Sequence, residues 1–416
     1  MCLGGKISLK DVEMANRPIY LYITPFFPSP ETWRGGYCLD AVKALIRLEK
    51  YDVRVMVPSK GEDYIWDGIS ISRIRRVSAP CGLVPFLFGW INKRFFKKKL
   101  KEIGISLDRI AVCHSNTFDC ANYAVALKQW NPKVKTLLHH HCSYGVDLRA
   151  GRLGRLPIHS TLLYFYYRML SEQVNAHVFC SEMSRRTFGK YFVTAPEGEV
   201  LDVRRQLLFG RWMRDWKMPE SIVLYNGVDT SVFHPKTNRP QNPNSFVIGC
   251  VANFQPLKGQ LTLLKAVNLV KEKIAGLYVR LVGSGEMLSV CKNYVEREGL
   301  SDFISFEREI DHRELPEFYR SLDLFVLPSR LEGFCCVYME CHACGTPVIG
   351  CKGVSLEEVI PIEVREQWLA NPNDSKSLAE KILGFYKARP QQTLFKQVDI
   401  DVLMRDFVNE IEAMRG

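Results

Sequence analysis

Two glutamates eight positions apart mark the segment with the clearest chemical potential. Glu332 and Glu340 follow an apolar run that ends at Leu327, and Gly333 lies between them. A strand that turns into a helix presents free backbone N–H groups and the positive end of the helix dipole, which suits a diphosphate or a sugar hydroxyl. Two carboxylates at this spacing could grip hydroxyls at both ends of one ligand or flank a developing positive charge. The alternative is a helix cap and a solvated side chain.

A run of histidines ends another apolar segment, Lys135–Leu138. Of this run, His139-His140-His141-Cys142, an imidazole at the strand end can hydrogen-bond a sugar or stabilise charge. A metal shared by His139 and His141 and a plain polar strand end are the alternatives. Cys341 to Cys344 form a C-x-x-C that small-residue packing explains better than zinc. Asp399-Ile400-Asp401 is best explained as a helix start capped by Asp.

The segment Leu83–Lys101 combines aromatic and basic residues. This composition favours an amphipathic surface for an anionic bilayer, with an aromatic face buried in the core as the alternative. Single-stranded nucleic acid could use the same residue types, but no recognised RNA or DNA module accompanies them. We therefore expect a membrane or acceptor surface and no nucleic acid partner. Its candidate residues are Trp90, Lys93, Arg94, Lys97, Lys98 and Lys99.

These candidates need elements to position them, and the chain alternates short apolar runs with longer amphipathic stretches. Such alternation predicts α/β architecture with mostly parallel sheets covered on both faces. The Pro-rich segment Thr230–Ser245 interrupts the pattern, which then restarts, so we predict two α/β halves joined by a hinge. Ligands of such sheets bind at the carboxyl ends of the strands, and the cleft between two halves is the expected site.

Composition limits the class of protein. The 416 residues are 47% hydrophobic and 24% charged, which excludes disordered and fibrous chains. Residues 1–240 carry 36 Lys and Arg against 21 Asp and Glu, a net +15, whereas residues 241–416 carry 20 against 24, a net −4. The basic half predicts an anionic partner. Its excess is concentrated at Arg73–Arg76, Lys93–Lys101, Arg149–Arg155 and Arg204–Arg214.

The sequence is not expected to contain a membrane span or a signal peptide. No apolar run reaches the length of a membrane span, and the first 17 residues lack a signal-peptide core. The 14 cysteines are scattered through apolar runs, which suits a reducing compartment. We therefore predict a cytoplasmic protein, with peripheral association at the inner face of the plasma membrane as a further expectation.

The block around the two glutamates resembles a known signature. Glu332 and Glu340 after Pro-Ser and before Gly345-Thr346-Pro347-Val348-Ile349 are similar to the signature of the family 4 retaining glycosyltransferases. Other stretches are similar in the same order, so the resemblance runs from about Tyr20 to Gly350. They are Ala176–Ser181, Val223–Asp229, Gly249–Gly259 and Leu281–Gly285.

The resemblance implies the GT-B fold, two Rossmann-like domains facing across a cleft. It implies an acceptor-binding domain over residues 1–235, with 1–17 as a loose extension, and a nucleotide-sugar-binding domain over residues 236–392. Residues 393–416 would form a helix that returns to the first domain. The implied activity is a metal-independent hexosyl transfer from a nucleoside diphosphate sugar to a glycan or lipid-linked acceptor, as in bacterial surface-polysaccharide assembly.

The resemblance also assigns roles to matching residues. Lys258 would meet the donor diphosphate, Glu340 the ribose and Glu332 the transferred sugar. The catalytic residues would be His141, with His140 as second choice, and Glu332. The other implied donor-binding positions are Gly35, Gly36, Asn253, Gly259, Gly283, Gly285, Gly333, Phe334 and Cys335.

Two of these positions depart from the family pattern. Asn253 stands where the family often has Arg, and Cys335 stands where Gly is usual. Two other functions stay open beside sugar transfer: a sugar-nucleotide epimerase on the same fold and a degenerate module that binds a membrane or a partner. A NAD-dependent dehydrogenase is disfavoured because Gly283-Ser284-Gly285 lacks the third glycine of the dinucleotide fingerprint. No cofactor or metal is expected, since Lys258 and backbone dipoles would carry the leaving-group charge.

Overall fold

The computed structural model describes residues 16–30, 32, 35–77, 84–141, 166, 168–188, 220–236, 244–392 and 399–414. The chain divides into a first unit, Met1–Tyr225 with Asp401–Gly416, and a second unit, Asn226–Ile400. This boundary lies earlier than the one predicted after residue 235. The reason is that the connecting segment packs on the second unit. The Phe233 ring lies 5.2 Å from that of His312, and Arg320 donates to a carbonyl of this segment.

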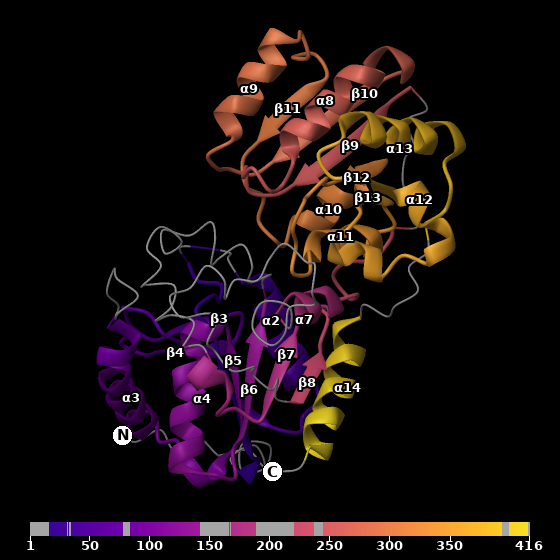
Figure 1. The fold of residues 1–416 in the computed structure, drawn as a ribbon. Coiled ribbons are helices and arrows are strands. Elements are labelled where there is room, and N and C mark those ends of the chain that lie inside the picture. The colour runs from indigo at the N-terminus through magenta and orange to yellow at the C-terminus, as the bar shows by residue number, and fades with distance from the viewer. Residues whose placement is uncertain are drawn as a thin grey trace, which may run out of the picture. The chain divides into compact units, whose positions relative to one another are not determined.

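The first unit is built on an eight-stranded sheet in the order β3-β4-β2-β1-β5-β6-β7-β8 (Figure 1). All neighbouring strands are parallel except β3 and β4. The strands are β1 (Ile19–Ile23), β2 (Asp52–Val57), β3 (Tyr64–Trp66), β4 (Ile69–Arg73), β5 (Ile110–Asn116), β6 (Lys135–His140), β7 (Ala176–Phe179) and β8 (Glu220–Val223). The helices are α2 (Gly36–Arg47), α3 (Val84–Glu102), α4 (Phe118–Trp130), α7 (Glu182–Phe188) and α14 (Ile400–Ala413).

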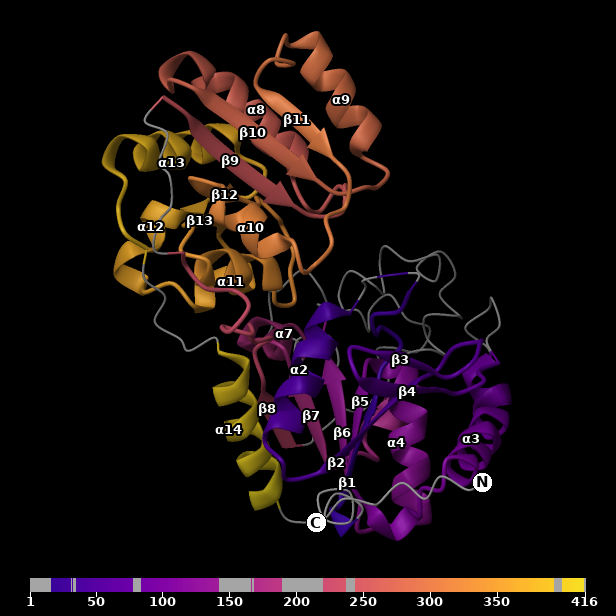
Figure 2. The same cartoon turned by 180° about the vertical axis from the view of Figure 1, so that it is seen from behind.

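Both faces of this sheet are covered, as the runs of apolar residues predict. On β1, Ile19, Leu21 and Ile23 belong to the core cluster that includes side chains of α3 and α4. Tyr20 and Tyr22 alternate with them and are also buried. Figure 2, which shows the unit from behind, has α2 and α14 on that second face. The sheet is therefore a buried layer, and its loops at the strand ends are the places where chemistry can be exposed.

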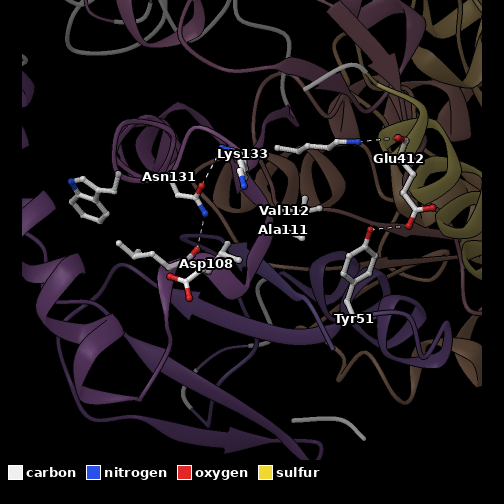
Figure 3. Close-up of a pocket in the computed structure, with 11 residues that line it drawn as sticks. Tyr51, Asp108, Ala111, Val112, Asn131, Lys133 and Glu412 are labelled. Carbon is white, nitrogen blue, oxygen red and sulfur yellow. Dashed lines mark hydrogen bonds between the residues drawn. The ribbon is translucent and has the colours of Figure 1, made fainter. Parts of the chain in front are cut away.

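Helix α14 packs on the first unit, the return of the C-terminal helix that the GT-B resemblance implies. Asp401 pairs with Arg47 of α2 at 2.6 Å. At the other end, the Tyr51 hydroxyl donates to Glu412 at 3.0 Å (Figure 3). Between them Phe407 is buried, with its ring 5.7 Å from His114 of β5. The helix thus closes the sheet face that α2 leaves uncovered.

The second unit holds a six-stranded parallel sheet in the order β11-β10-β9-β12-β13-β14. Its strands are β9 (Phe246–Val251), β10 (Leu277–Val282), β11 (Ile304–Glu307), β12 (Leu324–Val326), β13 (Val348–Cys351) and β14 (Leu369–Ala370). Its helices are α8 (Gln260–Val270), α9 (Leu288–Arg297), α10 (Leu315–Arg320), α11 (Cys336–Ala343), α12 (Arg365–Trp368) and α13 (Ser375–Ala388). Short 3₁₀ turns lie at Leu107–Arg109, Lys271–Lys273, Ser355–Glu358 and Ile362–Val364.

Strand order fixes where a ligand can bind in each unit. In the first sheet β1 lies between β2 and β5, and in the second β9 lies between β10 and β12. In each sheet the chain therefore first adds strands on one side of the central strand and later adds strands on its other side. This reversal of direction opens a crevice at the carboxyl ends of the central strands. The two Rossmann-like sheets have the architecture that the sequence predicts.

Candidate active site

The loop from β9 to α8 carries the predicted phosphate-binding residues of the second unit. Gly259 has φ +74° and directly precedes α8, and a Cβ there would collide with the carbonyl oxygen of Pro328. The loop is held from inside, because Gln260 donates to the Asn253 carbonyl at 2.9 Å. The Asn253 side chain itself is exposed. Lys258 and the free N–H groups of the first turn of α8 are thus fixed at the end of the central strand.

Gly283 and Gly285 lie in the loop after β10, against the loop that holds Lys258. A Cβ on either would collide with backbone of that loop, at the carbonyls of Ala252 and Phe254. Both glycines have positive φ, 137° and 145°. Their residue type is therefore explained by close backbone packing, and their contact with a donor stays a prediction.

The two predicted charged residues of this site contact each other. Lys258 Nζ lies 2.7 Å from Glu332 Oε1, and their side chains are 23% and 9% exposed. Burial lowers the pKa of Lys258, but the Glu332 carboxylate more than offsets this, so the net pKa is raised. Lys258 is charged at neutral pH, and an incoming phosphate must share it with Glu332.

Glu340 lies in α11 and is held by two residues that the sequence did not reveal. Its Oε2 accepts a hydrogen bond from the Tyr319 hydroxyl at 2.8 Å, and its Oε1 lies 3.3 Å from His312 Nε2. Tyr319 is fully buried. Burial and then the Glu340 carboxylate raise the pKa of Tyr319, so this phenol remains a donor. The carboxylate is thus oriented before any ligand arrives.

Gly333, Phe334 and Cys335 form the turn that enters α11. Phe334 is buried, and its carbonyl accepts from Asn226 at 3.4 Å. Cys335 is the residue that precedes the helix. Burial and the nearby Glu332 raise the pKa of the Cys335 thiol, which excludes a thiolate nucleophile here. The turn therefore places the start of α11 between Glu332 and Glu340 in the sequence, and the Tyr338 N–H at this start donates to the Cys335 carbonyl at 3.3 Å.

The first unit brings its own predicted residues together at the carboxyl ends of β1, β5 and β6. Gly35 has φ +94°, and a Cβ there would collide with the Phe26 carbonyl, so only glycine fits this entry to α2. Gly36 is the first residue of α2. The next residue, Tyr37, has its ring 4.8 Å from that of His141. The glycines and the histidine run therefore meet at one edge of the sheet.

His141 is oriented by a side chain that lies far from it in the sequence. Its Nε2 lies 2.8 Å from Asn116 Oδ1, and Asn116 Nδ2 donates to the Ile23 carbonyl at 3.4 Å. With the Asn116 oxygen facing the ring, Nε2 carries the proton and Nδ1 is an acceptor. Nδ1 has no hydrogen-bond partner among the described residues. Burial lowers the pKa of His141 to about 3, so the ring is neutral.

His140 and His139 point into the packed body of the unit. His140 is fully buried, its Nε2 lies 2.9 Å from His177 Nδ1, and its ring stacks 4.6 Å from that of Phe179. His139 Nδ1 lies 3.0 Å from His114 Nε2. Burial lowers the pKa of both well below the usual value. Of the two histidines predicted as catalytic, His141 alone lies beside Gly35–Tyr37, and His140 is a core histidine.

Comparison with known proteins agrees with this geometry. Residues 233–397 match the family of glycosyl transferases group 1. The predicted resemblance is confirmed: this segment is a group 1 glycosyltransferase domain.

Curated relatives of this domain match over part of their length. A GDP-mannose-dependent alpha-(1-6)-phosphatidylinositol monomannoside mannosyltransferase of Mycolicibacterium smegmatis is 28% identical over 148 residues, 32% of this chain and 39% of that protein. The lipopolysaccharide core biosynthesis mannosyltransferase LpsB of Rhizobium meliloti is 28% identical over 217 residues, 49% of this chain and 61% of that protein. The chain thus spans less than two thirds of either relative.

Solved structures are similar over nearly the whole chain. A sucrose-phosphate synthase from Thermosynechococcus elongatus has TM-score 0.68 and 17% identity, and covers 96% of this chain and 100% of that one. Anabaena Alr3699/HepE, solved with UDP and glucose, has TM-score 0.64 and 15% identity, and covers 95% and 100%. At these identities the likeness shows the fold, which is GT-B.

The other two candidate motifs, Cys341 to Cys344 and Asp399 to Asp401, have structural explanations. Cys341 and Cys344 are buried at the end of α11 and form no disulfide with any described residue. Asp399 accepts from Thr230, whereas Asp401 pairs with Arg47, so the two carboxylates face different partners. Within the described ranges, no three His, Cys, Asp or Glu side chains group as metal ligands.

The basic residues of α3 do not form one continuous face. Lys93 donates to Gln129 at 3.1 Å, and Lys97 lies over the Trp130 ring. Arg94 lies over Trp90, which is 56% exposed. Lys98 is exposed, and Lys99 pairs with Asp63. Phe96 belongs to the core, so part of the aromatic content serves packing. The clusters Arg149–Arg155 and Arg204–Arg214 lie outside the described residues.

In the part of the chain that is described, none of the helices combines the length and apolarity needed to span a bilayer.

A cavity of about 660 Å³ in the first unit is lined by Tyr51, Asp108, Asn131 and Lys133 (Figure 3). It lies at the amino ends of β5 and β6, the edge of the sheet opposite to His141. It is therefore separate from the candidate catalytic residues.

Proposed function

We propose that the protein is a retaining hexosyltransferase that moves a sugar from a nucleoside diphosphate sugar to an acceptor hydroxyl. The observation that carries this is the group at the ends of β9 and β12. There the partly buried Lys258–Glu332 pair lies beside the start of α8, and Glu340, oriented by Tyr319, lies in α11, both within the matched segment. A cation with helix N–H groups suits a diphosphate, and a carboxylate suits ribose hydroxyls.

The reaction follows from these groups. The bond between the sugar C1 and the diphosphate oxygen breaks, and the acceptor oxygen bonds to C1 on the same face. The acceptor proton passes to the departing diphosphate, whose charge Lys258 and the N–H groups of α8 stabilise. Glu332 lies where it can meet the transferred sugar or its developing positive charge. No protein nucleophile is required, and the Cys335 thiol is protonated.

His141 is the catalytic histidine of this proposal. Its Nε2–H is held by Asn116, and Nδ1 is a buried acceptor without a partner among the described residues, so the proposal requires Nδ1 to become exposed when it accepts a hydrogen bond from a sugar hydroxyl. The neutral ring makes it an orienting group rather than an acid at neutral pH. Asn116 is then a positioning residue. An Asn116→Leu variant should lower kcat while leaving the KM for the donor nearly unchanged, and an Asn116→Asp variant should retain part of kcat. Equal losses in both variants, or an effect confined to stability, would contradict this role.

The donor charge is proposed to need no metal, because Lys258 and backbone N–H groups meet it. Transfer should therefore persist in excess EDTA. Loss of activity in EDTA that Mg²⁺ or Mn²⁺ restores would refute this part.

A glycan or lipid-linked acceptor at a membrane is the proposed second substrate. The mannosyltransferase relatives are named for a phosphatidylinositol mannoside and for a lipopolysaccharide core, which supports a lipid-linked acceptor. Trp90 with Arg94, and the exposed Lys97 and Lys98, offer a reduced aromatic and basic patch for an anionic surface. The scattered free thiols suit the cytoplasmic side. Sedimentation with anionic vesicles should fall with added salt, and binding that ignores lipid charge would contradict the surface.

The deciding experiment is a titration with UDP-, GDP- and ADP-sugars, followed by assay of nucleoside diphosphate release with glycan acceptors. We expect one nucleotide class to bind and to be consumed. Binding without turnover would favour a degenerate module instead. A changed sugar still attached to its nucleotide would favour the epimerase, although the relatives reported above transfer sugars.

A further inference from the structure

A second charged depression lies in the first unit, away from the histidine run. It is a groove of about 440 Å³ between the loop after β2, the end of β4 and one side of α3. Figures 1 and 2 both show α3 beside β3 and β4. In the sheet, β4 and β2 lie on one side of β1, and β5, which ends at Asn116, and β6, which ends just before His141, lie on the other. The groove is thus separate from the residues assigned to sugar transfer.

The groove gathers more positive charge than the protein neutralises. Five cationic side chains line it, against the single carboxylate of Glu102. Lys99 forms ion pairs with Glu102 at 3.0 Å and with Asp63 at 2.8 Å. Lys60, Arg75 and Lys98 form no ion pair with any residue in the described ranges. Like charges that line one groove repel one another, and a bound anion would relieve the repulsion.

The groove also contains an unsatisfied hydroxyl. Ser59 Oγ is buried, and no described residue hydrogen-bonds to it. A buried hydroxyl without a partner carries a desolvation cost of about 1–3 kcal/mol, so such groups usually meet a ligand or water. Ser59 lines the same groove as the unpaired cations. Two independent observations therefore point to a missing acceptor.

Arg73 gives the groove a fixed shape. Its Nη1 donates to the Lys60 carbonyl at 2.7 Å, and its guanidinium lies 4.8 Å from the centre of the Tyr64 ring. Gly61, with φ +116°, leaves room for this guanidinium, because a Cβ there would press against it. Arg75 is likewise placed over the Phe95 ring. Guanidinium groups held in this way recognise phosphate more selectively than mobile lysines do.

We propose that this groove binds a phosphate group, with Arg75, Lys98 and Lys60 supplying charge and Ser59 supplying a neutral hydrogen bond. A phosphate monoester fits the donor set, because its oxygens can accept from guanidinium, ammonium and hydroxyl groups arranged around it. The phosphate could belong to a lipid headgroup or to a soluble ester. The inference does not depend on sugar transfer, since Lys258, Glu332, Glu340 and His141 are not involved, although Lys98 also belongs to the surface proposed for an anionic membrane.

The test is a titration of the full chain with inorganic phosphate and with glycerol 3-phosphate. It is run in a Lys258→Gln background so that an oxyanion at the second unit does not contribute. Replacing Arg75→Gln and Lys98→Gln together should weaken binding by about tenfold or more, as expected for lost charge-assisted hydrogen bonds. A matched control, Lys101→Gln with Lys133→Gln, removes the same charge from exposed positions outside the groove and should leave binding unchanged.

The Ser59→Ala variant separates a built site from diffuse attraction. It retains every charge, so it should weaken phosphate binding several-fold without changing the dependence on salt. Sedimentation with phosphatidylcholine vesicles containing phosphatidic acid distinguishes the sources. Pelleting that depends on Arg75 and Lys98 assigns the site to a lipid headgroup, and phosphate binding without pelleting assigns it to a soluble ester. Absence of saturable phosphate binding, or equal weakening by the control pair, would overturn the proposal.

Discussion

The Lys258–Glu332 pair allows a test in which two substitutions of one ion pair have opposite effects on nucleotide binding. Lys258 is proposed to serve the diphosphate, yet in the free protein it is bound to Glu332 at 2.7 Å. Lys258→Gln should therefore weaken nucleoside diphosphate binding. Glu332→Gln should leave that binding unchanged or tighten it, because the lysine no longer has a competing partner. Sugar transfer should fall in both variants, since Glu332 is assigned to the transferred sugar.

The magnitudes follow from burial and charge. Loss of a hydrogen bond to a charged group costs about 1.5–3 kcal/mol, so Lys258→Gln should weaken binding by roughly 10- to 150-fold. Release of the pair in Glu332→Gln is worth at most about 1 kcal/mol, or roughly fivefold tighter binding. Lys258→Gln also removes the ammonium group from beside a carboxylate that is 9% exposed. Fully buried pairs cost about 3–5 kcal/mol when one member is removed and exposed pairs about 0–1, so we expect a stability loss of about 2 kcal/mol.

Calorimetric titration with UDP, GDP and ADP measures the binding, and urea unfolding measures the stability. Arg280→Gln is the matched control. It breaks a similar pair with Glu307, also at 2.7 Å, on strands β10 and β11 of the same unit, and should lower stability without affecting nucleotide binding. The reasoning is refuted if Lys258→Gln binds nucleotide like the wild type, or if Glu332→Gln weakens binding tenfold.

Three further outcomes are expected. Burial lowers the pKa of His114 to about 3 and those of its neighbours below their usual range; the unfolded chain therefore binds more protons below about pH 6.5, and each such histidine removes up to about 1.4 kcal/mol of stability per pH unit. The urea concentration at the unfolding midpoint should be lower at pH 5 than at pH 7.5, and equal concentrations at the two pH values would contradict this. Tyr319→Phe deprives Glu340 of a donor at 2.8 Å, and nucleotide binding measured by calorimetry should weaken several-fold, whereas unchanged affinity would remove Glu340 from the site. Gly259→Ala adds a backbone collision to positive φ, whereas Gly104→Ala has positive φ and open space, so thermal unfolding should show a larger loss for Gly259→Ala, with equal losses as the contrary result.

The sequence predicted the order of most elements because their apolar runs are local signals. The apolar run Ile19–Thr24 predicts a strand and the amphipathic run Pro85–Ile103 predicts a helix, and the structure has β1 at Ile19–Ile23 and α3 at Val84–Glu102. Helix α4 was missed. Nine of its thirteen residues are buried, so it has no polar face to give a helical period. Strand β3 was missed because it has only three residues.

The site was predictable where a residue acts through its own type and position. Glycines at strand ends, Lys258 and the two glutamates were visible in this way. The partners that orient them were not, because those contacts join distant segments. Tyr319 reaches Glu340 from the preceding helix, and Asn116 reaches His141 from a neighbouring strand. The choice between His140 and His141 likewise needed the sheet, since adjacent residues of a strand point to opposite faces.

The central claim, retaining transfer from a nucleotide sugar, is tested most directly by the configuration of the first product. The full chain is incubated with α-linked UDP-, GDP- and ADP-hexoses without acceptor, so that water serves as a slow substitute. The anomeric proton of the released sugar is followed by NMR before mutarotation. The α-anomer should appear first, and His141→Ala should slow its appearance. A β-anomer as the first product, or no consumption of any donor, would contradict the account.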